Sequence, residues 1–204
     1  MKIKICGITR VEDAQLCVEL GVDAIGFIFY PKSKRYITPE KAKDIASTLP
    51  IFTHKIGVFV DEDVNEVNRI AKLVGLSGVQ LHGNETVEYI LQITHPVIKG
   101  FGVDETFDFS ILDNYSNCGI LLDVKDPEQY GGTGNSFYWD LIPNEIRRNV
   151  IIAGGVGINN IENISKNISP YAIDLSSSVE IEPGIKDKDK LNKLFEKYTE
   201  LRKL

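Results

Sequence analysis

The chain has 204 residues, 43% of them hydrophobic, which is enough for one sizeable core in one domain or at most two. Its net charge of −6 and the shortness of its basic cluster, KSKR, argue against nucleic acid as a partner. There is no signal-like start and no apolar run near the roughly 20 residues of a membrane span, so we expect a cytoplasmic protein without membrane contact.

Short apolar runs rich in β-branched residues recur at intervals of about 20–30 residues and predict strands. They cover residues 3–6, 24–29, 55–60, 78–81, 97–101, 119–123, 150–153 and 172–175. Several, such as AIGFIF and VIIAG, are continuously apolar and do not alternate. Continuous runs are typical of strands that are buried on both faces, as in parallel sheets.

The stretches between the predicted strands carry helix signals. TRVEDAQLCVELG predicts a helix with Thr9 as N-cap, Glu12 completing a capping box and Gly21 as the stop. TPEKAKDIASTLP predicts a second helix, with Thr38 as N-cap and Pro39 at the first helical position.

Later helices are predicted in the same way. DVNEVNRIAKLVG places apolar residues at helical spacing and ends at Gly75, and DKDKLNKLFEKYTELRKL predicts a closing amphipathic helix. Residues 104–117 are less regular and predict a short or irregular helix.

This alternation predicts the α/β class: a single (β/α)₈ TIM barrel with a closed, parallel, eight-stranded sheet over residues 1–204. A doubly wound open sheet is the structural alternative. Its dinucleotide-binding form carries GxGxxG after the first strand, whereas CGITR follows the first strand here. We therefore expect the barrel.

Active sites of such barrels lie at the C-terminal ends of the strands, where Cys6 and Asp123 are predicted. A thiol has a reference pKa of about 8.5 and serves as a base when it is partly ionised. A strand-end carboxylate is suited to proton transfer. Residue type leaves alternatives open, because such a cysteine is more often a small buried hydrophobe and the aspartate could instead cap a loop. The other cysteines, Cys17 and Cys118, fit the hydrophobic role, and the absence of any CxxC pair argues against a disulfide framework and a cysteine zinc site.

Small residues follow the last three predicted strands and suggest a phosphate site. The candidates are Gly132 and Gly134 in YGGTG, Gly154 and Gly155 in AGGVG, and Ser176 and Ser177 in DLSSSVE. Their backbone N–H groups can approach a ligand closely, and a helix start behind each loop adds positive charge. The alternative is that the glycines only form tight turns.

The loop YPKSKRYI brings Arg35 to the same end of the barrel, where its planar fork suits a carboxylate. An exposed basic loop is the plainer interpretation. His82 in QLHGNE is a hydrogen-bond donor or orients its loop. His54 and His95 precede strands and belong to the opposite end, so the histidines predict no metal site.

A series of motifs along the chain carries a family resemblance. In order, these motifs are KICGIT, GFIFYPKSKRYI, GVFV, VQLHGNE, LLD, GGTG, AGGV and DLSSSVE…PGIKD. Together they resemble the phosphoribosylanthranilate isomerase family of tryptophan biosynthesis. The resemblance covers nearly the whole chain, apart from residues 104–117. It implies a (β/α)₈ barrel that converts N-(5′-phosphoribosyl)anthranilate to 1-(2-carboxyphenylamino)-1-deoxyribulose 5-phosphate, with no metal or organic cofactor. It also implies Cys6 as general base, Asp123 as general acid, Arg35 facing the anthranilate carboxylate, and glycine loops holding the phosphate. The expected partner is this small molecule alone, bound to a monomer or a homodimer.

Ser178 departs from the family pattern, because glycine is usual at this position. Serine there implies either backbone strain or an added hydroxyl donor. Other hypotheses remain at this point. An aminoaldose isomerase of histidine biosynthesis would have paired aspartates at the ends of strands one and five, where Cys6 and the neutral KGFGV stand. Indoleglycerol-phosphate synthase would need a lysine such as Lys99 as its acid, and a non-catalytic phosphate-ligand binder would need neither Cys6 nor Asp123.

Overall fold

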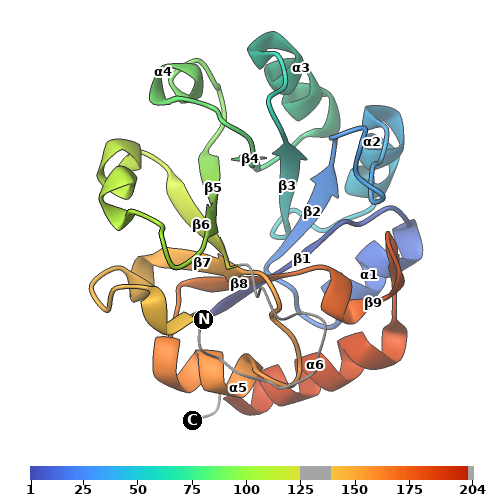
Figure 1. The fold of residues 1–204 in the computed structure, drawn as a ribbon. Coiled ribbons are helices and arrows are strands. Elements are labelled where there is room, and N and C mark those ends of the chain that lie inside the picture. Colours follow the sequence, from blue (N-terminus) through green and yellow to red (C-terminus); the bar gives the residue numbers. More distant parts are fainter. Residues whose placement is uncertain (125–138, 202–204) are drawn as a thin grey trace.

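Eight parallel strands close into a barrel in the computed structural model, which describes residues 1–124 and 139–201 (Figure 1). In order around the ring they are β1 (Lys2–Cys6), β2 (Ala24–Ile28), β3 (His54–Phe59), β4 (Gly78–Leu81), β5 (Val97–Val103), β6 (Gly119–Val124), β7 (Val150–Ala153) and β8 (Ala172–Leu175). Pairing of β1 with β8 closes the ring. The predicted fold class and all eight predicted strands are confirmed.

Helices surround the barrel on its outside (Figure 1). They are α1 (Val11–Glu19), α2 (Pro39–Ser47), α3 (Val64–Val74), α4 (Val87–Ile90), α5 (Ile161–Asn163) and α6 (Lys188–Leu201). A 3₁₀ helix, Phe109–Tyr115, connects β5 to β6 in the segment predicted to be irregular. None of the helices in the described residues is both long and apolar enough to cross a membrane.

The predicted caps are confirmed for the second helix and wrong for the first. The Thr38 hydroxyl accepts from the Lys41 backbone N–H, and Pro39 begins α2. Helix α1 instead begins at Val11, with no side-chain cap on its N-cap residue. Thr9 donates its hydroxyl to the backbone oxygen of Gly184, because an antiparallel hairpin lies against the start of α1. This hairpin, β9 (Glu180–Glu182) and β10 (Ile185–Lys186), is not predicted from the sequence.

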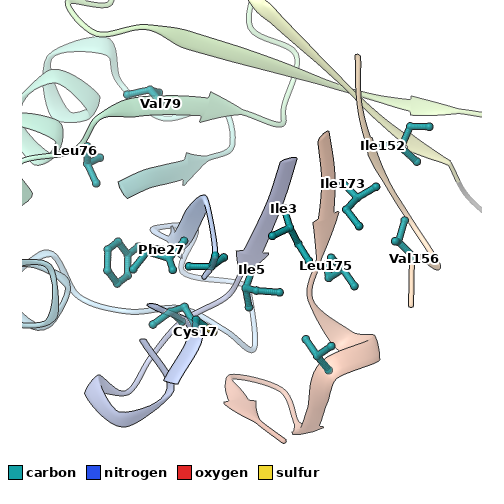
Figure 2. Close-up of a cluster of buried hydrophobic side chains, with 14 of the residues drawn as sticks. Ile3, Ile5, Cys17, Phe27, Leu76, Val79, Ile152, Val156, Ile173 and Leu175 are labelled. Carbon is teal, nitrogen blue, oxygen red and sulfur yellow. The ribbon is translucent and has the colours of Figure 1, made fainter. Parts of the chain in front are cut away.

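Two apolar layers position the strand-end side chains. Ile3 and Ile5 belong to the large cluster between the strands and the helices (Figure 2). Because side chains alternate along a strand, Lys4 and Cys6 lie on the opposite face of β1, toward the barrel interior. A smaller cluster fills that interior with Ile98, Leu121, Ile151, Ala153 and Ala172. The polar side chains that line the site lie above this apolar floor.

Candidate active site

A cavity of about 250 Å³ opens at the C-terminal ends of the barrel strands. Eight of the predicted site residues line it: Cys6, Arg35, His82, Asp123, Gly154, Gly155, Ser176 and Ser177. Gly132 and Gly134, the other two phosphate candidates, lie outside the described residues. Residues from both halves of the chain thus meet in one concave site.

Cys6 ends β1, and its thiol is buried, with 7% of the residue exposed. Gly7 then adopts a φ of 78°, which lets the chain turn away at once. In β2, Gly26 stands opposite Cys6, and a Cβ at Gly26 would lie 2.8 Å from the sulfur. Burial raises the pKa of the Cys6 thiol, and the nearby Lys4 ammonium opposes this rise.

Lys4 and Asp174 form a buried ion pair beside Cys6. Their Nζ and Oδ2 atoms are 2.7 Å apart, and the β1–β8 register places the two residues side by side. Burial opposes the charge of Lys4, but Asp174 and Cys6 outweigh it and keep the Lys4 pKa above its usual value. The second carboxylate oxygen of Asp174 has no hydrogen-bond partner in the described part of the chain, and Asp174 lines the cavity. Sequence reasoning missed this pair.

Asp123 ends the apolar run of β6 and faces the cavity with about a third of its side chain exposed. His82 Nε2 lies 3.4 Å from Asp123 Oδ2, and the Gln80 amide nitrogen lies 3.2 Å from His82 Nδ1. The Gln80 amide thus holds one ring nitrogen of His82, and the other, Nε2, faces Asp123. Gly100 makes room for the imidazole, since a Cβ there would lie 2.9 Å from Nδ1.

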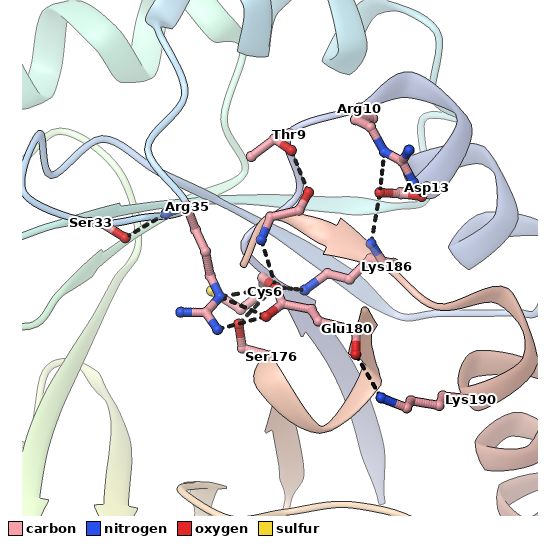
Figure 3. A network of polar contacts seen from close by, with 11 residues as sticks. Cys6, Thr9, Arg10, Asp13, Ser33, Arg35, Ser176, Glu180, Lys186 and Lys190 are labelled. Carbon is pink, nitrogen blue, oxygen red and sulfur yellow. Dashed lines mark hydrogen bonds and ion pairs between the residues drawn. The ribbon is translucent and has the colours of Figure 1, made fainter. Parts of the chain in front are cut away.

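Arg35 is held by a carboxylate of the hairpin (Figure 3). Its Nε and Nη2 donate to Glu180 at 2.9 and 2.6 Å, and Lys186 Nζ donates to the same carboxylate at 2.8 Å. Burial alone would raise the pKa of Glu180, but these cations outweigh burial and hold the pKa below its usual value. Lys186 also donates to the backbone oxygen of Cys6 at 2.6 Å. Glu180 and Lys186 lie within the motif DLSSSVE…PGIKD, yet sequence reasoning gave them no role.

The loops after β7 and β8 present backbone groups to the cavity. Gly154 and Gly155 have φ values of 83° and 63°, a conformation that favours glycine. Asn160 braces this loop, because its side chain accepts from Gly157 N at 2.8 Å and donates to Gly155 O at 2.9 Å. The helix after β8 is a three-residue 3₁₀ turn, Ser177–Val179. The positive charge there therefore comes from individual backbone N–H groups and not from a long helix.

Ser178 lines the cavity without backbone strain. In the described residues, positive φ outside glycine is confined to Asp61 and Ser169. The strain that serine implied at this position is therefore absent. Its Cβ lies 3.1 Å from the point where a Cβ of Gly157 would stand, so Gly157 supplies the room that Ser178 needs.

Lys99 does not belong to the lining of this cavity. Its ammonium is buried outside it, 2.7 Å from Gly83 O and 3.1 Å from Glu85. His54 begins β3 and His95 precedes β5, both at the N-terminal end of the barrel, as predicted. Over residues 1–124 and 139–201, no group of three or more His, Cys, Asp or Glu residues is placed to hold a metal ion.

Comparisons with known proteins identify the family of the chain. A family model described as N-(5′-phosphoribosyl)anthranilate (PRA) isomerase matches residues 3–197. The N-(5′-phosphoribosyl)anthranilate isomerase of Thermotoga maritima is 46% identical over 199 residues, which are 96% of each chain. That of Bacillus mycoides is 44% identical over 206 residues and the full length of both chains.

Solved structures give the same result. The crystal structure of phosphoribosyl anthranilate isomerase from Thermotoga maritima has a TM-score of 0.88 at 43% identity, covering 98% of both chains. A phosphoribosyl anthranilate isomerase in complex with reduced 1-(o-carboxyphenylamino)-1-deoxyribulose 5-phosphate has a TM-score of 0.87 at 39% identity, covering 98% of this chain and 99% of that one. The chain belongs to the N-(5′-phosphoribosyl)anthranilate isomerase family.

Proposed function

We propose that the cavity binds N-(5′-phosphoribosyl)anthranilate and converts it to 1-(2-carboxyphenylamino)-1-deoxyribulose 5-phosphate, with Cys6 as general base and Asp123 as general acid. One observation carries the proposal: a thiol and a carboxylate from separate strands line one cavity together with the loops after β7 and β8 and Arg35. A structural relative binds the reduced form of this product.

The reaction moves protons within one molecule, so one acid and one base suffice. Asp123 protonates the furanose ring oxygen, and cleavage of the bond from that oxygen to C1′ gives a Schiff base. The Cys6 thiolate then removes the proton from C2′ to give an enolamine. Tautomerisation of the enolamine gives the ketone. Cys6 on β1 and Asp123 on β6 are separated by β7 and β8 in one direction around the ring and by four strands in the other. This separation favours approach of the base and the acid to the sugar from two sides.

Binding of the two charged ends of the substrate fixes the sugar between acid and base. The loops with Gly154, Gly155, Ser176 and Ser177 suit the phosphate, because their amide and hydroxyl groups line the cavity. Arg35 suits the anthranilate carboxylate. Glu180 engages its Nε and Nη2, and Nη1 has no partner among the described residues, which leaves it for the ligand.

The other hypotheses have less support. Lys99, the candidate acid of a synthase, lies outside the cavity lining and is paired with Glu85. The paired aspartates of a histidine-pathway isomerase would require a carboxylate of β5 in the cavity, but Asp104, which follows β5, does not line it. A non-catalytic binder would need neither Cys6 nor Asp123, yet both line the cavity.

The Thermotoga maritima relative is described as dimeric. For this chain, monomer or homodimer stays a prediction.

The test follows the fluorescence of freshly formed phosphoribosylanthranilate, against a reference without protein. Wild type should consume it, and Arg35→Ala should raise KM by about tenfold or more through loss of a charge-assisted hydrogen bond. Lys34→Ala, at an exposed lysine of the same loop, is the matched control and should leave KM unchanged. No consumption by wild type overturns the function, and an unchanged KM in Arg35→Ala overturns the carboxylate assignment.

A further inference from the structure

A lysine is buried directly below the thiol of Cys6. Lys4 precedes Cys6 by two residues in β1, so both side chains lie on the inner face of the strand. The Lys4 ammonium donates a hydrogen bond to Asp174 at 2.7 Å and interacts electrostatically with the Cys6 side chain. Only 5% of the Lys4 side chain is exposed, so water screens its charge weakly.

Gly26 brings the two side chains together. A single point, the place of a Cβ on Gly26, lies 2.8 Å from the Cys6 sulfur and 3.2 Å from Lys4 Cε. Both side chains therefore share the space that the missing side chain of β2 leaves open. Any larger residue would force the thiol and the ammonium stem out of this arrangement.

Four charged groups act on Cys6: Lys4 on the same strand, Asp174 on β8, Lys186 on β10 and Arg35 in the loop after β2. Lys186 is engaged by Glu180 and by the backbone oxygen of Cys6, and Arg35 is engaged by Glu180. Of these cations, Lys4 acts most strongly on the thiol, and its stem lies beside the sulfur at Gly26. Asp174 is the opposing anion, because its charge disfavours a thiolate.

We propose that Lys4 is the positioning residue that makes Cys6 available as a base: its ammonium stabilises the Cys6 thiolate, while Asp174 fixes the ammonium and limits this effect. The inference rests on the proposed function and names the group that activates its base. In this arrangement the Cys6 S–H releases its proton to solvent, the sulfur keeps the electron pair and Lys4 stays protonated. No neighbour has to accept the proton.

The test measures ionisation of Cys6 directly, apart from activity. In a Cys17→Ala/Cys118→Ala background, thiolate ultraviolet absorbance against pH reports Cys6 alone. Lys4→Met should move this titration to higher pH by about one unit or more, a roughly tenfold loss of thiolate at a given lower pH. Asp174→Asn should move it to lower pH. If the ion pair were only structural, loss of either member would not be expected to shift the Cys6 titration in opposite directions. Lys99→Met, at a second buried and paired lysine, is the matched control and should leave the titration in place.

The acid limb of kcat/KM against pH should move with each titration. An unmoved titration in Lys4→Met, or shifts of the same sign in Lys4→Met and Asp174→Asn, overturns the proposal. Should Lys4→Met fail to fold, the neutral pair K4M/D174N replaces it. A smaller upward shift is then expected, because loss of the Asp174 charge partly offsets loss of the Lys4 charge, and an unmoved or lowered titration contradicts the proposal. If wild type shows no isomerase activity while the opposite shifts appear, the proposed function fails and the role of Lys4 toward the thiolate stands.

Discussion

Two glycines in the strands make room for the side chains that are proposed to do the chemistry. Gly26 faces the Cys6 sulfur and Gly100 faces the His82 ring, and a Cβ at either position would lie closer than 3.0 Å to its neighbour. Contacts this short force a shift in a packed interior. The positions of Cys6 and His82 therefore depend on the absence of side chains at these two sites.

Gly26→Ala should lower kcat by at least tenfold, because the new methyl group displaces the Cys6 sulfur and a small misplacement of a reacting group costs rate steeply. KM should change less, since Gly26 does not belong to the cavity lining in the described residues. The matched control is Gly119→Ala, where the added Cβ meets its first neighbour at 3.5 Å, an ordinary contact. Steady-state kinetics of both folded variants check this, and equal kcat values would contradict it.

The sequence held a signal for Lys4 that prediction did not use. KIKIC alternates, so Lys4 and Cys6 necessarily share one face of the strand. That this face is the barrel interior follows once Ile3 and Ile5 are assigned to the helix side. The partner Asp174 lies 170 residues away and meets Lys4 only because β1 closes the barrel against β8. Long-range pairing of this kind is not visible in local patterns.

Among the elements, the segment between β7 and α5 depends on a single side chain for its shape. Asn160 joins Gly157 and Gly155 through its amide, so it restrains the glycine turn that is proposed to hold phosphate. The glycines give the turn its conformation, and Asn160 limits its motion. Binding of phosphate by backbone N–H groups benefits from this restraint, because less freedom is lost when the ligand binds.

Asn160→Ala should raise KM by about three- to tenfold, the scale of one or two lost hydrogen bonds, with little change in kcat. Inhibition by inorganic phosphate should weaken by a similar factor. Asn167→Ala is the matched control. Like Asn160, Asn167 makes a side-chain hydrogen bond, in its case to a nearby asparagine on the exposed surface, and it does not line the cavity. Steady-state kinetics with added phosphate give both values; an unchanged KM with an unchanged phosphate inhibition constant would argue against a phosphate loop here.

Elements with strong local signals were predicted well. Short apolar runs identified every barrel strand, and Thr38 with Pro39 marked the start of α2. Thr9 carried an equally good cap signal, yet its hydroxyl bonds to Gly184 in the hairpin. The hairpin itself was missed, because β9 and β10 are short and β9 reverses the expected burial, with Glu180 buried and Ile181 exposed. Glu180 and Lys186, which hold Arg35 and the Cys6 backbone, were missed with it.

At the scale of the whole molecule, barrel closure brings residues 6 and 123 into one cavity. The fold and the family predicted from the sequence are confirmed. The roles of the individual site residues stay predictions. Their meeting in one cavity, with Arg35 and the loops after β7 and β8 around it, is the physical basis for treating Cys6 and Asp123 as one catalytic unit.

The central claim is that these two residues serve one proton relocation, and a double-variant cycle tests it most directly. Turnover of freshly formed phosphoribosylanthranilate is measured for wild type, Cys6→Ser, Asp123→Asn and the double variant. Each single change should lower kcat by about 10²- to 10⁴-fold, and the double variant should be little worse than the weaker single variant, because groups that act as a unit are not additive. Near wild-type turnover in either single variant, or fully multiplicative losses in the double variant, would contradict the claim.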